Sequence, residues 1–173
     1  MKKIPLRRLT YMAVLTAIAL TIFMAEAQLP ALAPLPGIKL GLANIVTVYA
    51  MFALGPGPAG LILLARVLLG SLFAGGMTIF YSLSGGACCY LAMLLLRRLL
   101  TPRQMWVCSV LGAMAHNAGQ IGAAVLITRT PGVAVYLPVL LVSGILTGLF
   151  TGLCAQFVFS RLSRITPPGG RSS

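Results

Sequence analysis

The stretch Pro34-Leu35-Pro36-Gly37-Ile38-Lys39-Leu40-Gly41-Leu42-Ala43-Asn44 decides how this chain folds, because it is a polar, kinked interruption between two long apolar runs. Its two prolines stop a preceding helix and Gly37 lets the backbone turn, so we expect a new helix to begin at Ile38. A helix N-terminus favours an anion, and Lys39 in the first turn would strengthen that attraction. Two interpretations follow. Lys39 holds an anionic ligand, or it extends from a helix end to a membrane surface.

The composition around this stretch is that of an integral membrane protein. Of the 173 residues, 59% are hydrophobic and only 8% are charged, whereas about a quarter of the residues in a soluble domain are charged. Several apolar runs are long enough to cross a hydrocarbon core about 30 Å thick. We therefore expect an all-α polytopic membrane protein, with one transmembrane domain over residues 1–165 and a disordered polar tail over residues 166–173.

Turn signals divide the apolar sequence into a bundle of six transmembrane helices, expected at 9–29, 38–54, 59–73, 77–96, 104–128 and 133–159. Ten of the thirteen Lys and Arg residues lie at the N-terminus, in the loop from Arg97 to Arg103, or near the C-terminus. Six spans place these three segments on one side, so the positive-inside rule predicts cytoplasmic N- and C-termini. Because the basic residues flank apolar spans, we interpret the net charge of +12 as membrane anchoring and not as nucleic-acid binding.

Polar side chains inside apolar spans are costly, and a functional role is the default hypothesis for them. His116 and Gln120 are four residues apart, on one helix face, and Asn117 lies about 100° round. The histidine is either an interhelical hydrogen-bond partner or a ligand contact. Arg66 should face the bundle interior, a partner or a water-filled cavity. It is either paired with Glu26, bonded to carbonyls or extended to the surface. We expect an outward-facing pocket formed by the Lys39 turn and by Glu26, Asn44, Tyr81, Ser82, His116, Asn117 and Gln120.

The sequence also bears on catalysis. A single acidic residue cannot supply the carboxylates that hold Mg²⁺ in prenyl or phosphoryl transfer. No P-loop is present, and one histidine without a carboxylate cluster cannot complete a metal site. We therefore expect no enzyme, no metal and no cofactor. Energy for any transport would come from a partner or a gradient, and Glu26 and His116 are the plausible proton carriers.

Small residues spaced four apart allow close helix packing in lipid. Gly144, Gly148 and Gly152 have this spacing, as do Ala13 and Ala17. Each set is explained either by packing within the chain or by docking of a partner membrane protein.

Three motifs resemble those of the bacterial Gx transporter family, which is often labelled heptaprenyl diphosphate synthase component I. The motifs are Pro36 to Asn44, Phe80 to Gly86, and His116 to Gln120, and the resemblance extends from about Leu9 to Phe159. It implies similarity to the substrate-binding S components of energy-coupling factor transporters, which are six-helix proteins of the bacterial cell membrane. Such proteins capture a vitamin or similar small molecule from outside. They work with a shared transmembrane subunit and with ATPases. Ala13 and Ala17 match the docking pattern for that subunit.

These observations support an integral membrane subunit that captures a small molecule. Lys39 and the helix N-terminus would hold an anionic group, His116, Asn117 and Gln120 would hydrogen-bond the ligand, and Tyr81 would stack on it. Flavin, a quinone precursor and an isoprenoid are all compatible ligands. The alternative is a non-catalytic accessory subunit of a prenyl-diphosphate, quinone or redox system. A third hypothesis is a proton-coupled carrier that uses Glu26 and His116.

Overall fold

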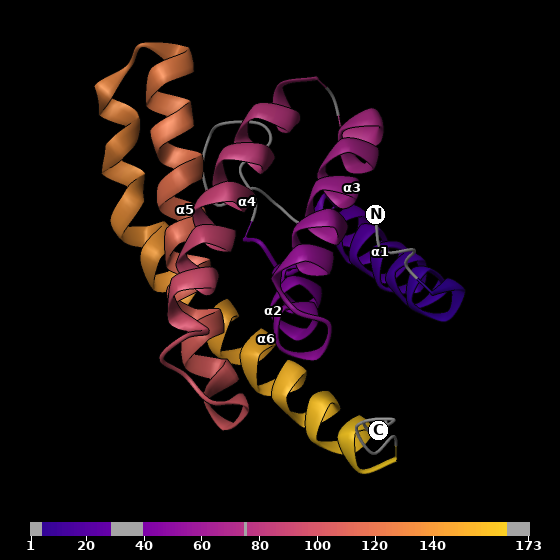
Figure 1. Ribbon diagram of the computed structural model, residues 1–173. Helices are drawn as coiled ribbons and strands as arrows, with labels where there is room; N and C mark the ends of the chain where they lie inside the picture. Colours follow the sequence, from indigo (N-terminus) through magenta and orange to yellow (C-terminus); the bar gives the residue numbers. More distant parts are fainter. Residues whose placement is uncertain (1–4, 29–39, 75, 166–173) are drawn as a thin grey trace.

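The computed structural model describes residues 5–28, 40–74 and 76–165. All regular secondary structure in these ranges is helical, which confirms the predicted all-α fold class. The elements in chain order are α1 (Leu6–Glu26), α2 (Asn44–Ala53), α3 (Pro56–Ala74), α4 (Gly76–Leu96), the short 3-10 helix η1 (Pro102–Gln104), α5 (Met105–Thr128), the 3-10 helix η2 (Pro131–Tyr136) and α6 (Leu137–Ile165) (Figure 1).

Within the described ranges, five helical segments are long and apolar enough to cross a membrane, so the predicted count of six spans is not confirmed. These segments are α1, α3, α4, α5 with η1, and α6 with η2. The predicted helix start at Ile38 is wrong, because α2 begins at Asn44 and has only 10 residues. Gly41 has a φ of +81°, which glycine tolerates, and this breaks the helix ahead of Asn44. Lys39 is therefore not in the first turn, and its side chain and the tail 166–173 lie outside the described residues.

Helix α2 lies in the centre of the bundle. Most of its side chains are buried, and its Val48, Ala50 and Met51 are fully covered. They share one apolar cluster with residues of every longer helix, including Met12, Ile62, Met93, Cys108 and Ala155. At 1.5 Å per residue, α2 is about 15 Å long, half the thickness of a hydrocarbon core.

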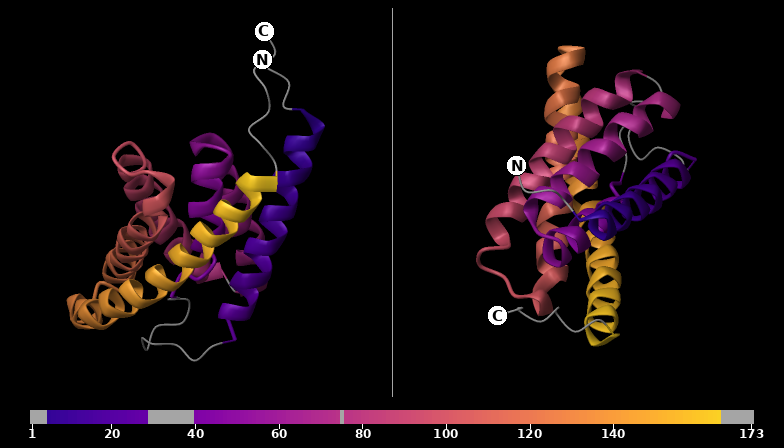
Figure 2. Two further views of the ribbon diagram at one scale, coloured as in Figure 1. Left: turned by 90° about the horizontal axis from the view of Figure 1, so that it is seen from below. Right: turned by 45° about the vertical axis from the view of Figure 1, so that its right-hand side comes forward.

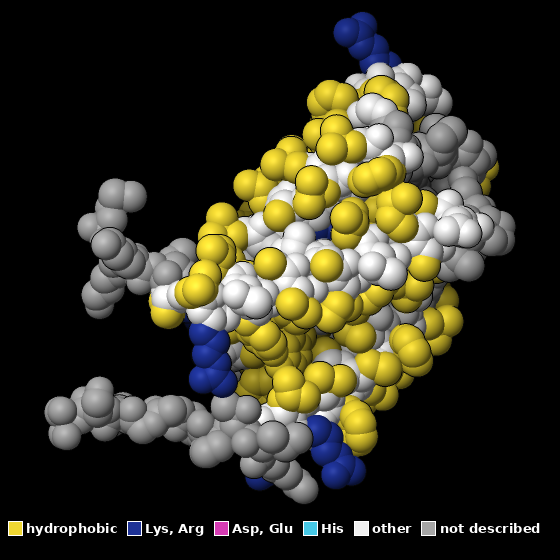
Figure 3. All heavy atoms as spheres, turned by 90° about the vertical axis from the view of Figure 1, so that its right-hand side faces the viewer, with side chains coloured by type: hydrophobic (Ala, Val, Ile, Leu, Met, Phe, Trp, Pro, Cys, Tyr) yellow, Lys and Arg dark blue, Asp and Glu magenta, His cyan; other side chains and the backbone are white. Residues whose placement is uncertain are grey.

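One end of the bundle gathers the start of α1, the end of α2 and the end of α6, as the left view of Figure 2 shows for α1 and α6. Arg8 Nη2 donates a hydrogen bond to the Leu54 carbonyl at 2.8 Å, and the Tyr11 and Tyr49 hydroxyls lie 2.6 Å apart. The Tyr49 and Phe159 rings meet edge to face, with centroids 6.3 Å apart. In Figure 3, hydrophobic side chains cover the middle of one face, and arginine side chains lie at its ends.

Helices α5 and α6 meet through the three glycines that the sequence places four apart. A Cβ atom at Gly152 would lie 2.5 Å from Trp106 Cα, and one at Gly148 would lie 2.7 Å from Val110 Cα. Gly144 similarly faces Asn117 and Ala113. The interpretation of these glycines as packing residues within the chain is confirmed.

Several helix boundaries differ from prediction; α1, for example, is Leu6–Glu26 and not 9–29. Helix α3 begins at Pro56 and not at residue 59, because Gly55, with φ +96°, makes the reversal by itself. Proline is compatible with a first helical turn, where its missing N–H is not needed. Helix α6 continues to Ile165, past the predicted end at Phe159.

Candidate functional site

Four polar side chains are buried together where α2 begins. They are Glu26, the last residue of α1; Asn44, the first residue of α2; Arg66, in the middle of α3; and His116, in the middle of α5. Each is at most 5% exposed. Since buried polar groups are costly unless they are paired, their contacts decide what this polar cluster can do.

Two hydrogen bonds tie the polar cluster together. The Gly41 backbone N–H donates to Glu26 Oε1 at 2.5 Å, and Arg66 Nη2 donates to Asn44 Oδ1 at 3.3 Å. The Arg66 guanidinium also interacts electrostatically with Glu26 and lies 5.9 Å from the centre of the Phe23 ring. Extension of Arg66 to the surface is wrong, because the side chain is only 2% exposed and its hydrogen-bond partner is a side-chain amide.

Two glycines allow the backbone to approach His116 closely. A Cβ atom at Gly41 would lie 2.8 Å from Asn44 Nδ2 and 3.0 Å from His116 Cδ2. A Cβ atom at Gly85 of α4 would lie 3.0 Å from His116 Cε1 and 2.7 Å from Gln120 Cγ, and the Gly85 backbone also interacts with the imidazole. Neither glycine was among the predicted site residues, although Gly41 lies in the motif Pro36 to Asn44 and Gly85 in the motif Phe80 to Gly86.

Three atoms of the polar cluster have no hydrogen-bond partner within the described part of the chain: Asn44 Nδ2, Arg66 Nε and His116 Nδ1. Each is fully buried, and an unpaired buried polar group costs about 1–3 kcal/mol. Native proteins leave few such groups unpaired, and in many proteins a bound ligand or an ordered water molecule satisfies them. The three atoms lie on three different helices, α2, α3 and α5, at one place in the bundle.

The amides at the start of α2 do not form the predicted anion site. The N–H groups of Asn44, Ile45 and Val46 bond to the carbonyls of Gly41, Leu42 and Ala43 at 2.9–3.3 Å. The turn itself therefore uses these three donors.

The other predicted ligand residues divide between two places. Gln120 is buried beside Gly85, next to His116. Asn117 faces α6 instead, where its Nδ2 donates to the Leu140 carbonyl at 2.5 Å. Tyr81 packs in a separate apolar cluster that contains Ile121, Ala124, Val133 and Leu140. Ser82 is also buried, at 4% exposure. The structure thus brings Glu26, Asn44, His116 and Gln120 together with Arg66, and places Asn117 and Tyr81 in the packing of α5.

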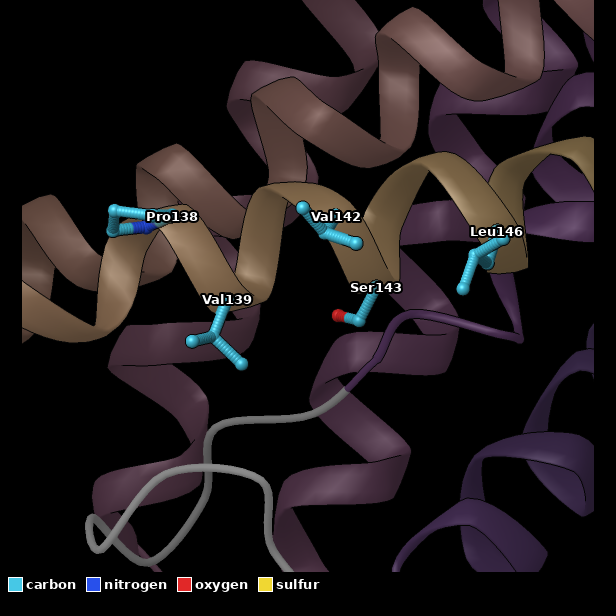
Figure 4. Close-up of a pocket in the computed structure, with 5 residues that line it drawn as sticks. All are labelled: Pro138, Val139, Val142, Ser143 and Leu146. Carbon is cyan, nitrogen blue, oxygen red and sulfur yellow. The ribbon is translucent and has the colours of Figure 1, made fainter.

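Two surface features lie outside the polar cluster. Ala13 and Ala17 are exposed on α1, next to exposed Val14 and Ile18, so this face is not used for packing within the described chain. A hollow of about 420 Å³ on α6 is lined by Pro138, Val139, Val142, Ser143 and Leu146 (Figure 4). Its one polar side chain, Ser143, already donates to the Leu140 carbonyl at 3.0 Å. This hollow suits apolar chains and offers little to a polar ligand.

Comparison with known proteins identifies the family to which this chain belongs. No curated protein and no solved structure matches the chain. The family model described as heptaprenyl diphosphate synthase component I matches residues 15–158, which include every residue of the polar cluster. Because the match covers most of the sequence, the chain belongs to the heptaprenyl diphosphate synthase component I family.

Proposed function

We propose that this protein is the substrate-binding component of a membrane uptake system, and that it binds a small molecule in the polar cluster at the start of α2. The observation that carries the proposal is the set of unpaired buried atoms on Asn44, Arg66 and His116. A purely structural role for these residues predicts paired atoms, because leaving them unpaired opposes folding.

The position of the polar cluster supports this role. It lies at the middle of α3 and α5 and at the start of the half-length α2, so a ligand bound there would be held within the bundle. The Glu26–Gly41 hydrogen bond joins the end of α1 to the turn before α2.

The surroundings fit a multi-pass protein of the bacterial cell membrane. The end of the bundle with Arg8 and the tip of α6 would face the cytoplasm under the positive-inside rule. Energy would come from a partner that includes ATPases, and the exposed Ala13 and Ala17 would contact its membrane subunit. The proposal assigns no reaction to the chain itself.

The family description favours a second candidate, a non-catalytic accessory subunit of a prenyl-diphosphate synthase system. Native mass spectrometry of the protein, extracted gently from its own membrane, separates the two. A retained small molecule that is lost in Asn44→Asp, but kept in the exposed control Gln104→Glu, supports substrate capture. Recovery of the wild type without any small molecule, but bound to a synthase, contradicts substrate capture and favours the accessory role.

A further inference from the structure

We infer that the ligand presents an oxyanion, a carboxylate or a phosphate group, to Arg66 and Asn44. This inference deepens the proposed function and rests on it. It concerns the chemical class of the ligand, which follows from the kind of atoms left unpaired.

The unpaired atoms of Arg66 and Asn44 are both hydrogen-bond donors. Arginine is a permanent cation with five N–H donors and no acceptor. One of its donors, on Nη2, is used by Asn44, and the Nε–H is unpaired. Only an acceptor can satisfy such a group, and a guanidinium pairs best with the oxygens of carboxylates and phosphates.

The orientation of the Asn44 amide follows from the same chemistry. Because Arg66 can only donate, the acceptor Oδ1 must face it, at 3.3 Å. The Nδ2 group then points away from Arg66 and lies close to Gly41, where a Cβ atom would be 2.8 Å from it. Because residue 41 is a glycine, no Cβ atom contacts the Asn44 donor from this position.

Glu26 does not remove the need for an external acceptor. Its Oε1 accepts the Gly41 N–H, and its charge interacts with Arg66, yet the Arg66 Nε and Asn44 Nδ2 donors stay unpaired. Its negative charge does oppose the entry of a second anion. Glu26→Gln keeps an acceptor oxygen for Gly41 and removes this repulsion, so it should tighten oxyanion binding.

The test uses the full-length protein in lipid nanodiscs and measures its Tm against sodium acetate, inorganic phosphate and sodium chloride at equal ionic strength. A ligand that binds only the folded state raises Tm once its concentration exceeds its Kd, and Tm goes on rising with the logarithm of concentration. We expect acetate or phosphate, but not chloride, to do so, and the effective probe identifies the anionic group. Asn44→Asp retains an oxygen for Arg66 but replaces the donor by a negative charge, so it should weaken the response about 10- to 100-fold.

Two comparison variants make the result decisive. Gln104→Glu adds the same charge at an exposed site and should respond like the wild type. Arg66→Lys retains the charge but lacks the Nε–H, and should bind the probe more weakly. A wild type that responds to neither probe, or an Asn44→Asp variant that responds like Gln104→Glu, overturns the inference. If native mass spectrometry then still finds a small molecule that Asn44→Asp loses, the proposed function stands without the oxyanion; if it finds none, the proposed function fails as well.

Discussion

Replacement of Gly152 by alanine tests the packing of α6 on α5. The added Cβ atom would lie 2.5 Å from Trp106 Cα and 2.7 Å from Ser109 Cβ, where ordinary contacts begin near 3.4 Å. Trp106 Cα is a backbone atom of α5, so no rotation of a side chain can relieve the contact. The two helices must separate locally by up to about 1 Å, and overpacking of this kind costs about 1–3 kcal/mol.

Two further effects modify this estimate. The Ser109 and Thr151 hydroxyls lie 3.0 Å apart beside Gly152, and separation of the helices weakens this hydrogen bond, which is worth about 1 kcal/mol. Alanine stabilises a helix by about 0.5–1 kcal/mol relative to glycine, which offsets part of the loss. We therefore expect Gly152→Ala to lower the free energy of unfolding by about 1–3 kcal/mol.

Gly122 provides a matched control, because it also lies within a helix, α5, and nothing lies within 4 Å of its Cβ position. Gly122→Ala should be neutral or stabilising by up to about 1 kcal/mol. Denaturant titration in mixed micelles, followed by the fluorescence of the single tryptophan, Trp106, measures both variants. Equal stabilities of Gly152→Ala and Gly122→Ala would refute the account of a glycine-lined α5–α6 contact.

Three further perturbations test other contacts. Gly41→Ala should destabilise the protein by about 1–3 kcal/mol in the same titration, since alanine disfavours φ +81° and its Cβ would contact Asn44 and His116; unchanged stability would show that the turn relaxes freely. Tyr11→Phe and Tyr49→Phe each remove the same 2.6 Å hydrogen bond, so each should cost about 1 kcal/mol and the double variant no more than either. Additive losses would mean that the two hydroxyls act independently. Asn117→Ala removes one donor from the Leu140 carbonyl, which keeps the bond from Ser143, and should raise the rate of thermal unfolding with a loss of about 1 kcal/mol; a wild-type unfolding rate would contradict the contact.

Hydropathy predicted the long helices well, because a segment of about 20 apolar residues has few alternatives to a membrane-spanning helix. It failed at α2 for a physical reason. The run after Ile38 is apolar enough to be a span, but the positive φ at Gly41 starts the helix six residues later. A helix of only 10 residues is stable here because the longer helices bury it. Burial by other helices depends on tertiary packing, so the local sequence pattern could not predict it.

The polar cluster could be predicted in part. The cost of polar groups in apolar helices pointed correctly to burial of Glu26, Asn44, Arg66 and His116. The partners could not be predicted, because they depend on the rotation of each helix about its axis. Asn117 is adjacent to His116 in sequence yet bonds to α6, and Arg66 bonds to Asn44 although a carboxylate is nearby. The roles of Gly41 and Gly85 depend on close approach of two segments, which appears only in three dimensions.

The central position of α2 also constrains the order of assembly. A helix of 10 residues is too short to insert across a bilayer by itself and too short to be stable alone in water. Its buried face is completed by residues as late in the chain as Ala155 and Phe159. During synthesis, α2 can therefore reach its final packing only after α6 has entered the membrane. A chain truncated before α6 should leave α2 exposed to quality-control proteases.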